Sequence, residues 1–302
     1  MELSERSQVS IAQIVVFVPF LAVSVFLYVR HGFGRNAGWF FLLFFSLARI
    51  VGAALQLAAI AQPANVGLLF GALTLQGVGL SDLIIVLLAL VKRALEGIEK
   101  ARSSSVIQPR VLFWAELFVF VGVILGAVGG STAGSHYAQT GVYTVSSLTQ
   151  AGLGLTVAGF ALLVAATAVA GLNVSDAEAG ERRIVLAVAV ALPFLLVRVV
   201  YSAVGTFGQD PAFRAATGDV NLLLGLAVVE EIFIVFVVLA VGVTLKVLPK
   251  PEGGEAPKFP GFFGRPRLDR GQRRERRRER RTRHRGDYEL HRLSPHSYPP
   301  SV

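Results

Sequence analysis

Hydrophobic residues occur along this chain in seven long runs, separated by short polar segments. Each run is long enough for an α-helix, which rises 1.5 Å per residue, to cross roughly 30 Å of hydrocarbon. The pattern therefore predicts an all-α membrane protein folded as a bundle of seven transmembrane helices. The predicted spans are residues 10–29, 38–61, 66–91, 111–130, 144–172, 184–205 and 220–247.

The overall composition agrees with this prediction. Of 302 residues, 53% are hydrophobic and only 16% are charged, and the mean hydropathy is +0.60, more apolar than a soluble domain requires. No small-residue cleavage site closes the first run, so we expect it to be retained as a span. The chain contains no cysteine, which excludes disulfides and thiolate metal sites.

Lysine and arginine are distributed unequally between the two sides of the predicted bundle. One side holds only Arg6 and Arg214, whereas the other holds nine basic residues before the tail, and the segment 246–292 adds sixteen. Cytoplasmic loops carry the excess of basic residues. We therefore expect residues 1–9 to be a short extracellular or lumenal amino end, and the sequon at Asn173 to lie in the cytoplasm without a glycan.

The carboxyl end, after the transmembrane domain of residues 10–247, is predicted to be a disordered basic cytoplasmic tail over residues 248–302. Its segment 265–285 contains twelve arginines against three acidic residues, a net charge of +9 that equals that of the whole chain. Such a segment would bind anionic lipid headgroups or an acidic protein partner, or would only reinforce the topology. We expect no nucleic-acid partner, because no aromatic residues interleave the arginines. The predicted lipid contacts are Arg273, Arg274, Arg276, Arg277, Arg278, Arg280 and Arg281.

Ionisable residues interrupt several of the apolar spans. Arg49 lies at the centre of the second span, where insertion of an arginine costs roughly 2.5 to 3.5 kcal/mol and a partner is needed. The other candidate residues of this polar core are Asp82, Arg198, Tyr201, Glu230 and Glu231. Secondary candidates are Gln56, Gln76 and Glu116.

The depth of each residue along its span predicts which charges pair. Asp82 lies roughly 5 Å to the cytoplasmic side of the midpoint of its span, within reach of the Arg49 side chain. Arg198 and the two glutamates lie slightly to the outer side. We therefore expect Arg49 to pair with Asp82, and Arg198 to pair with Glu230 or Glu231. Since neighbouring residues on a helix point about 100° apart, only one of the two glutamates should face the bundle.

The intramembrane charges admit three interpretations. They can fix which helices are neighbours, line a polar cavity that binds or moves a molecule, or belong to an interface with another protein. The spans that carry Arg49 and Arg198 also share the pattern F-x-L-x-R-[IV]-V-x-x-A, and in both cases an acidic residue follows 33 residues later. A parallel duplication of three helices is therefore open as an alternative.

The chain shows little that would support catalysis. Its five histidines, at positions 31, 136, 284, 291 and 296, are expected in loops or the tail, which argues against a metal or haem site within the bundle. Neither a phosphate-binding loop nor a G-x-S-x-G motif occurs. We expect a protein that is not an enzyme and that has no metal and no cofactor.

The segments "PFLLVRVVYSAVGTF" and "LLLGLAVVEEIFIVFVVLAVGVTL", with "SLARIVGAALQ" and "GLSDLIIVLLALVKR", resemble a family of fungal integral membrane proteins known only as a domain of unknown function. The resemblance covers about residues 9–248. It implies a seven-helix bundle in which Arg49, Arg198, Tyr201 and one of Glu230 or Glu231 are family features. It also implies the plasma membrane or an endomembrane of a eukaryotic, fungal cell, and it implies no activity.

The leading functional hypothesis is binding or translocation of a small amphipathic or lipid-like molecule through a charged intramembrane cavity. The alternatives are a receptor-like sensor that signals through the 92–110 loop and the tail, and a non-catalytic membrane scaffold. The sequence leaves the oligomeric state open.

Overall fold

The structure is a computed structural model that describes residues 5–31, 37–62, 64–102, 106–208, 211–213 and 218–245. The regular elements in these ranges are all helical, and seven helices are long and apolar enough to cross a membrane. The prediction of an all-α protein with seven membrane-spanning helices is thereby confirmed. The predicted tail, with its seven lipid-binding arginines, lies outside the described residues.

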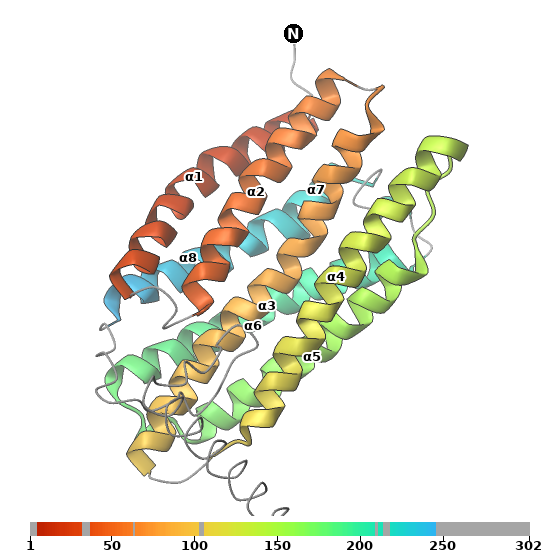
Figure 1. Ribbon diagram of the computed structural model, residues 1–302. Coiled ribbons are helices and arrows are strands. Elements are labelled where there is room, and N and C mark those ends of the chain that lie inside the picture. The colour runs from red at the N-terminus through yellow and green to blue at the C-terminus, as the bar shows by residue number, and fades with distance from the viewer. Residues whose placement is uncertain are drawn as a thin grey trace, which may run out of the picture.

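The helices run beside one another along a common direction (Figure 1). The first six long helices are α1 (Glu5–His31), α2 (Ala37–Ala61), α3 (Val66–Arg102), α4 (Pro109–Thr140), α5 (Ser147–Leu172) and α6 (Ala179–Phe207). The seventh span consists of α7 (Val220–Leu223), the π-helical segment η3 (Leu224–Val228) and α8 (Val229–Thr244). Short 3-10 turns, η1 (Val174–Asp176) and η2 (Pro211–Phe213), precede α6 and α7.

Several helices continue beyond the apolar runs that predicted them. With 37 residues, α3 is about 55 Å long, so the predicted 92–110 loop is in fact helical up to Arg102. The residues after position 91 are mostly Lys, Arg, Glu and Ala, which end an apolar run but are good helix formers. The expectation that histidines lie in loops was also wrong for His31, the last residue of α1, and for His136, which lies in α4.

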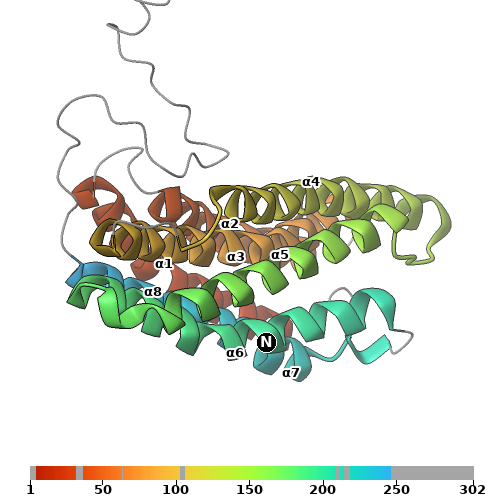
Figure 2. The same ribbon diagram turned by 90° about the horizontal axis from the view of Figure 1, so that it is seen from below.

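Helix α3 is the centre of the bundle. It contacts α2, α4, α5 and α6, and the view in Figure 2 places α6 and α8 along one side of the molecule and α4 along the opposite side. Every residue from Gly79 to Leu88 is buried. A helix that is buried all round is surrounded by other helices rather than by lipid, so α3 provides a floor for any site between the surrounding helices.

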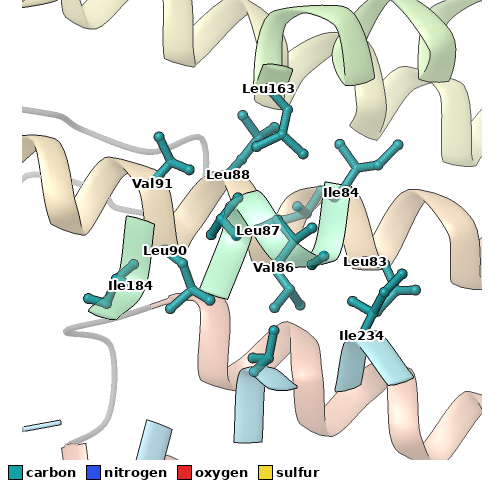
Figure 3. Close-up of a cluster of buried hydrophobic side chains, with 14 of the residues drawn as sticks. Leu83, Ile84, Val86, Leu87, Leu88, Leu90, Val91, Leu163, Ile184 and Ile234 are labelled. Carbon is teal, nitrogen blue, oxygen red and sulfur yellow. The ribbon is translucent and has the colours of Figure 1, made fainter. Parts of the chain in front are cut away.

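The second half of α3 is packed in a dry hydrophobic core. Leu83, Ile84, Leu87 and Leu88 are at most 1% exposed. They pack in one cluster with side chains of the surrounding helices (Figure 3). Those neighbours include Leu163 of α5, Ile184 of α6 and Ile234 of α8.

Helices α4 and α5 approach each other through glycine. A Cβ atom at Gly152 would lie 2.7 Å from the Gly122 carbonyl oxygen and 2.8 Å from the Gly126 nitrogen. Both of these are backbone atoms, which cannot move aside as the end of a flexible side chain could. Small residues at such positions let helices pack closely within a membrane.

Gly152→Ala should therefore destabilise the protein, by about 1 to 3 kcal/mol as expected for overpacking. Gly154→Ala is the matched control, since a Cβ there meets nothing within 4 Å and alanine favours a helix over glycine. The measurement is the unfolding midpoint of the detergent-purified protein. Equal effects of the two substitutions would contradict the close contact.

Candidate functional site

Three ionisable side chains from three helices meet in the interior of the bundle. Arg49 on α2, Arg198 on α6 and Glu231 on α8 are only 3%, 3% and 1% exposed. Gln76 on α3 is their common neighbour. We call Arg49, Arg198 and Glu231 the charge cluster.

One carboxylate oxygen joins the two arginines. The Oε1 atom of Glu231 accepts a hydrogen bond from Arg198 Nε at 2.9 Å and another from Arg49 Nη2. The backbone oxygen of Gln76 also accepts from both, from Arg49 Nη2 at 3.3 Å and from Arg198 Nη2 at 3.5 Å. Hydrogen bonds between ionised groups are stronger than neutral ones, so the cluster ties α2, α3, α6 and α8 together.

The structure confirms one predicted pairing and contradicts the other. Arg198 pairs with Glu231 as expected, but Arg49 pairs with Glu231 rather than with Asp82. Asp82 is buried and close enough to Arg49 for a Coulomb interaction, yet its Oδ2 has no hydrogen-bond partner among the described residues. The equal spacing of 33 residues therefore does not correspond to two equivalent ion pairs.

Gly79 explains why the Arg49 side chain extends to Glu231 and does not pair with Asp82. A Cβ at Gly79 would lie 2.7 Å from Arg49 Cζ, so the guanidinium occupies the space that a side chain would fill. Since residues three apart share a helix face, this space lies on the face of Asp82, about one turn earlier. The Arg49 Cζ also lies 5.1 Å from the centre of the Phe45 ring, a cation–π contact that holds the guanidinium in this position.

The π-helical segment η3 decides which glutamate enters the cluster. A π-helical turn contains one residue more than an α-helical turn, and one residue corresponds to a rotation of about 100°. Without this insertion, position 230 would take the orientation relative to α7 that Glu231 has. Glu231 is instead buried, while Glu230 is half-buried and outside the cluster, as expected for adjacent residues.

The larger of two cavities adjoins Arg198. Its volume is about 180 Å³, and it lies between the first half of α3, the second half of α4, the first half of α5, the end of α6 and α7. Arg198 donates to Ser202 Oγ, and Ser81 Oγ lies 3.1 Å from Thr156 Oγ1 across the space between α3 and α5. We call this space the large cavity. Its polar lining residues are Thr74, Gln76, Ser81, Tyr143, Ser146, Thr149, Thr156, Arg198, Tyr201, Ser202 and Thr206.

The smaller cavity adjoins Arg49. Its volume is about 30 Å³, and it lies between α1, α2, α3 and α7. We call it the small chamber. Gln76 and Leu223 line both cavities, so these two side chains stand between them.

The cavities expose only the positive charges of the cluster. Arg198 is the charged residue that lines the large cavity, and Arg6 and Arg49 are those that line the small chamber. Glu231 and Asp82 line neither of the two. A negatively charged or hydrogen-bond-accepting group that enters either space would therefore meet cations, with the acidic groups behind them.

Both cavities lie in the same half of the bundle, towards the face at which α1, α3, α5 and α7 begin. We call this the amino-terminal face. The hydrophobic core around Leu87 and Leu88 lies on the other side of the cluster.

Some polar atoms in and beside the cluster lack partners in the described part of the chain. They are Arg49 Nε, Glu231 Oε2 and Asp82 Oδ2. Buried polar groups are normally hydrogen-bonded to protein or to water, and of these three residues Arg49 is the one that lines a cavity, the small chamber. Within the described ranges, no group of three or more histidine or acidic side chains could hold a metal ion.

The remaining residues predicted for the polar core lie in different places. Tyr201 lines the large cavity and is 4% exposed. Gln56 lines the small chamber, and Gln76 contributes to the cluster through its backbone oxygen. Glu116 lies apart from the cluster and pairs with Lys92, whose Nζ is 3.2 Å from Glu116 Oε1.

The structure adds residues that were not predicted as part of the site. Ser202 had a signal in the sequence, because it lies four residues after Arg198 and thus on the same helix face. Gln13 of α1, which lines the small chamber, had a weaker signal in the sequence, because it is a single polar residue in an apolar run. Gly79 and η3 could not have been found, since their importance depends on what lies opposite them.

Comparison with known proteins places the chain in a family. Residues 3–248 match the family model described as Domain of unknown function (DUF7702), and the chain belongs to that family. The expected resemblance to a family of unknown function is confirmed by this match. Searches among curated proteins and among solved structures found no match.

Glu231→Gln should be strongly destabilising, because it leaves two buried guanidiniums without the carboxylate that they share. Removing one partner of a buried ion pair costs about 3 to 5 kcal/mol. Glu230→Gln is the matched control on the neighbouring residue and should change stability by less than about 0.5 kcal/mol. Denaturation of the purified protein measures both. Similar losses for the two variants would show that the cluster does not depend on Glu231.

Proposed function

We propose that this protein is a non-catalytic membrane protein that binds a small amphipathic molecule in the large cavity. The observation that supports this most directly is the lining of that cavity. It combines apolar walls with a row of hydroxyl groups and one charged side chain, Arg198. Ligand sites are typically apolar pockets with a few convergent polar groups that orient the ligand.

The volume of the cavity limits the size of the ligand. A cavity of about 150 Å³ holds a molecule such as benzene, so about 180 Å³ admits a short chain or a single ring with a small polar head. A complete two-chain phospholipid does not fit. Within the wider class of lipid-like molecules, short single-chain amphiphiles are therefore favoured.

The charge of the lining favours an acidic head group. A guanidinium offers five N–H donors in a plane that matches carboxylate and phosphate oxygens. Arg198 Nε is engaged by Glu231 and its Nη1 by Ser202, while its Nη2 makes only the long 3.5 Å contact with Gln76. The guanidinium thus keeps donor capacity on the side of the cavity.

Tight packing on the other side of the cluster favours binding over open passage. Leu83, Leu87 and Leu88 are at most 1% exposed there, so translocation would require α3 to separate from its neighbours. Sensing is the second candidate function, because α3 runs as one helix from the cavity, at Phe70, to Arg102. A ligand that shifts α3 would therefore move both ends of this helix, including the end at Arg102.

The orientation in the membrane is part of the proposal. The excess of basic residues on the side opposite the amino-terminal face favours a large cavity that opens towards the outside or the lumen. The basic tail would then bind anionic lipid headgroups or an acidic protein on the cytoplasmic side.

Pentanoate and pentanol form a pair of probes that differ in head-group charge. We expect the reconstituted full-length protein to bind pentanoate about 10-fold to 100-fold more tightly than pentanol, as one charge-assisted hydrogen-bonded contact would provide. Arg198→Gln should remove this preference, and Arg30→Gln, at the exposed end of α1, should keep it. Isothermal titration measures both affinities.

Gly126→Leu provides a test that keeps the charge cluster intact. Gly126 lines the large cavity, and a Cβ there meets nothing within 4 Å, so the added side chain should fill the space without strain. This variant should bind neither probe. If it binds pentanoate as the parent protein does, the ligand site is elsewhere.

The proposed topology predicts where glycans attach. Asn173 should remain unmodified, whereas Val142→Asn, which creates the acceptor sequence Asn-Tyr-Thr in the exposed α4–α5 loop, should gain a glycan. An endoglycosidase mobility shift after expression in eukaryotic cells detects it. A glycan on Asn173 would reverse the orientation.

A further inference from the structure

The small chamber has the features of a second binding site. Helices α1, α2, α3 and α7 surround it, and part of its wall consists of Ala48, Gly52, Ala53 and Ala72. These residues have little or no side chain with which to fill the space. The chamber is separated from the large cavity by Gln76 and Leu223, which line both.

Two buried hydrogen-bond donors on the lining residues have no partner in the described part of the chain. They are Gln13 Nε2 on α1 and Arg49 Nε on α2. The two residues are 5% and 3% exposed, so bulk water does not satisfy them. Because buried donors are normally paired, a bound acceptor is expected in the chamber, beside Gln13.

The charge around the chamber selects the kind of acceptor. The charged residues that line it are Arg6 and Arg49, both cationic, and Glu231 lies outside the lining. Arg6 Nη2 also donates to the Gly218 oxygen at 2.8 Å, which holds the Arg6 side chain near the start of the seventh span. A water molecule would have to donate its own hydrogens as well as accept, whereas an anion only accepts and also reduces the positive potential.

We infer that the small chamber binds a monovalent inorganic anion of about the size of chloride. A volume of about 30 Å³ accommodates one or two water molecules or one monatomic anion, and it is too small for an organic ligand. The donors would come from the Gln13 amide and the Arg49 guanidinium, the residues that line the chamber. The site is distinct from the large cavity and does not depend on the function proposed for it.

Chloride at constant ionic strength, with gluconate as the replacing anion, is the probe. A ligand that binds only the folded state raises its stability by an amount that grows with ligand concentration. We expect the unfolding temperature of the full-length protein in detergent to rise by several degrees with chloride and then to saturate, and bromide to act like chloride. An equal rise with gluconate, or no rise, overturns the inference.

Substitutions at Gln13 locate the effect. Gln13→Leu should abolish the chloride-dependent shift, and Gln150→Leu, a half-buried glutamine on α5 that lines neither cavity, should keep it. Gln13→Glu places a carboxylate beside Arg49 and should make the unfolding temperature independent of chloride, even if Gln13→Leu does not fold. A chloride shift that persists in Gln13→Glu would show that the anion binds elsewhere or that the chamber contains only water.

Discussion

The sharing of one carboxylate by two buried arginines is the interaction on which this structure depends. Two guanidiniums in an apolar interior need a counter-charge, and Glu231 Oε1 provides it to both Arg49 and Arg198. Several otherwise unrelated features follow from this arrangement. Gly79 leaves room for one guanidinium, the Gln76 carbonyl accepts from both, and the π-helical segment turns Glu231 rather than Glu230 into the interior. Arg49 and Arg198 thus both hold the helices together and line the cavities.

The sequence predicted the features that depend on depth and missed those that depend on direction. Hydropathy identified seven spans because each must be apolar over the thickness of a bilayer, and depth also paired Arg198 with one of the two adjacent glutamates, Glu230 or Glu231. Depth indicated the wrong partner for Arg49, because it favoured Asp82, whereas the structure joins Arg49 to Glu231 on a different helix. The choice between them depends on the missing side chain of Gly79 and on the rotation introduced by η3 (Leu224–Val228), and hydropathy encodes neither. The continuation of α3 was missed for a similar reason. Charged residues such as Lys92 end the apolar run, although they are good helix formers.

The position of the acids behind the arginines determines the chemistry of the cavities. If Glu231 or Asp82 lined the large cavity, a cation or a neutral polar group would be as well accommodated as an anion. Instead the charged residues that line both cavities are arginines. The Glu231 carboxylate, which makes burial of these arginines tolerable, lines neither cavity. The two permanently charged arginines are thereby presented to the two cavities.

The shared oxygen also connects the two cavities energetically. An acidic ligand that draws Arg198 towards the large cavity would leave more of the Glu231 charge to Arg49, and would thereby weaken the attraction of the small chamber for an anion. By linkage, an anion beside Arg49 must then weaken the binding of an acidic ligand beside Arg198 by the same factor. The direction follows from charge alone, since both arginines compete for one acceptor. Communication between the two cavities would therefore need no large movement of helices, only a redistribution of hydrogen bonds around Glu231.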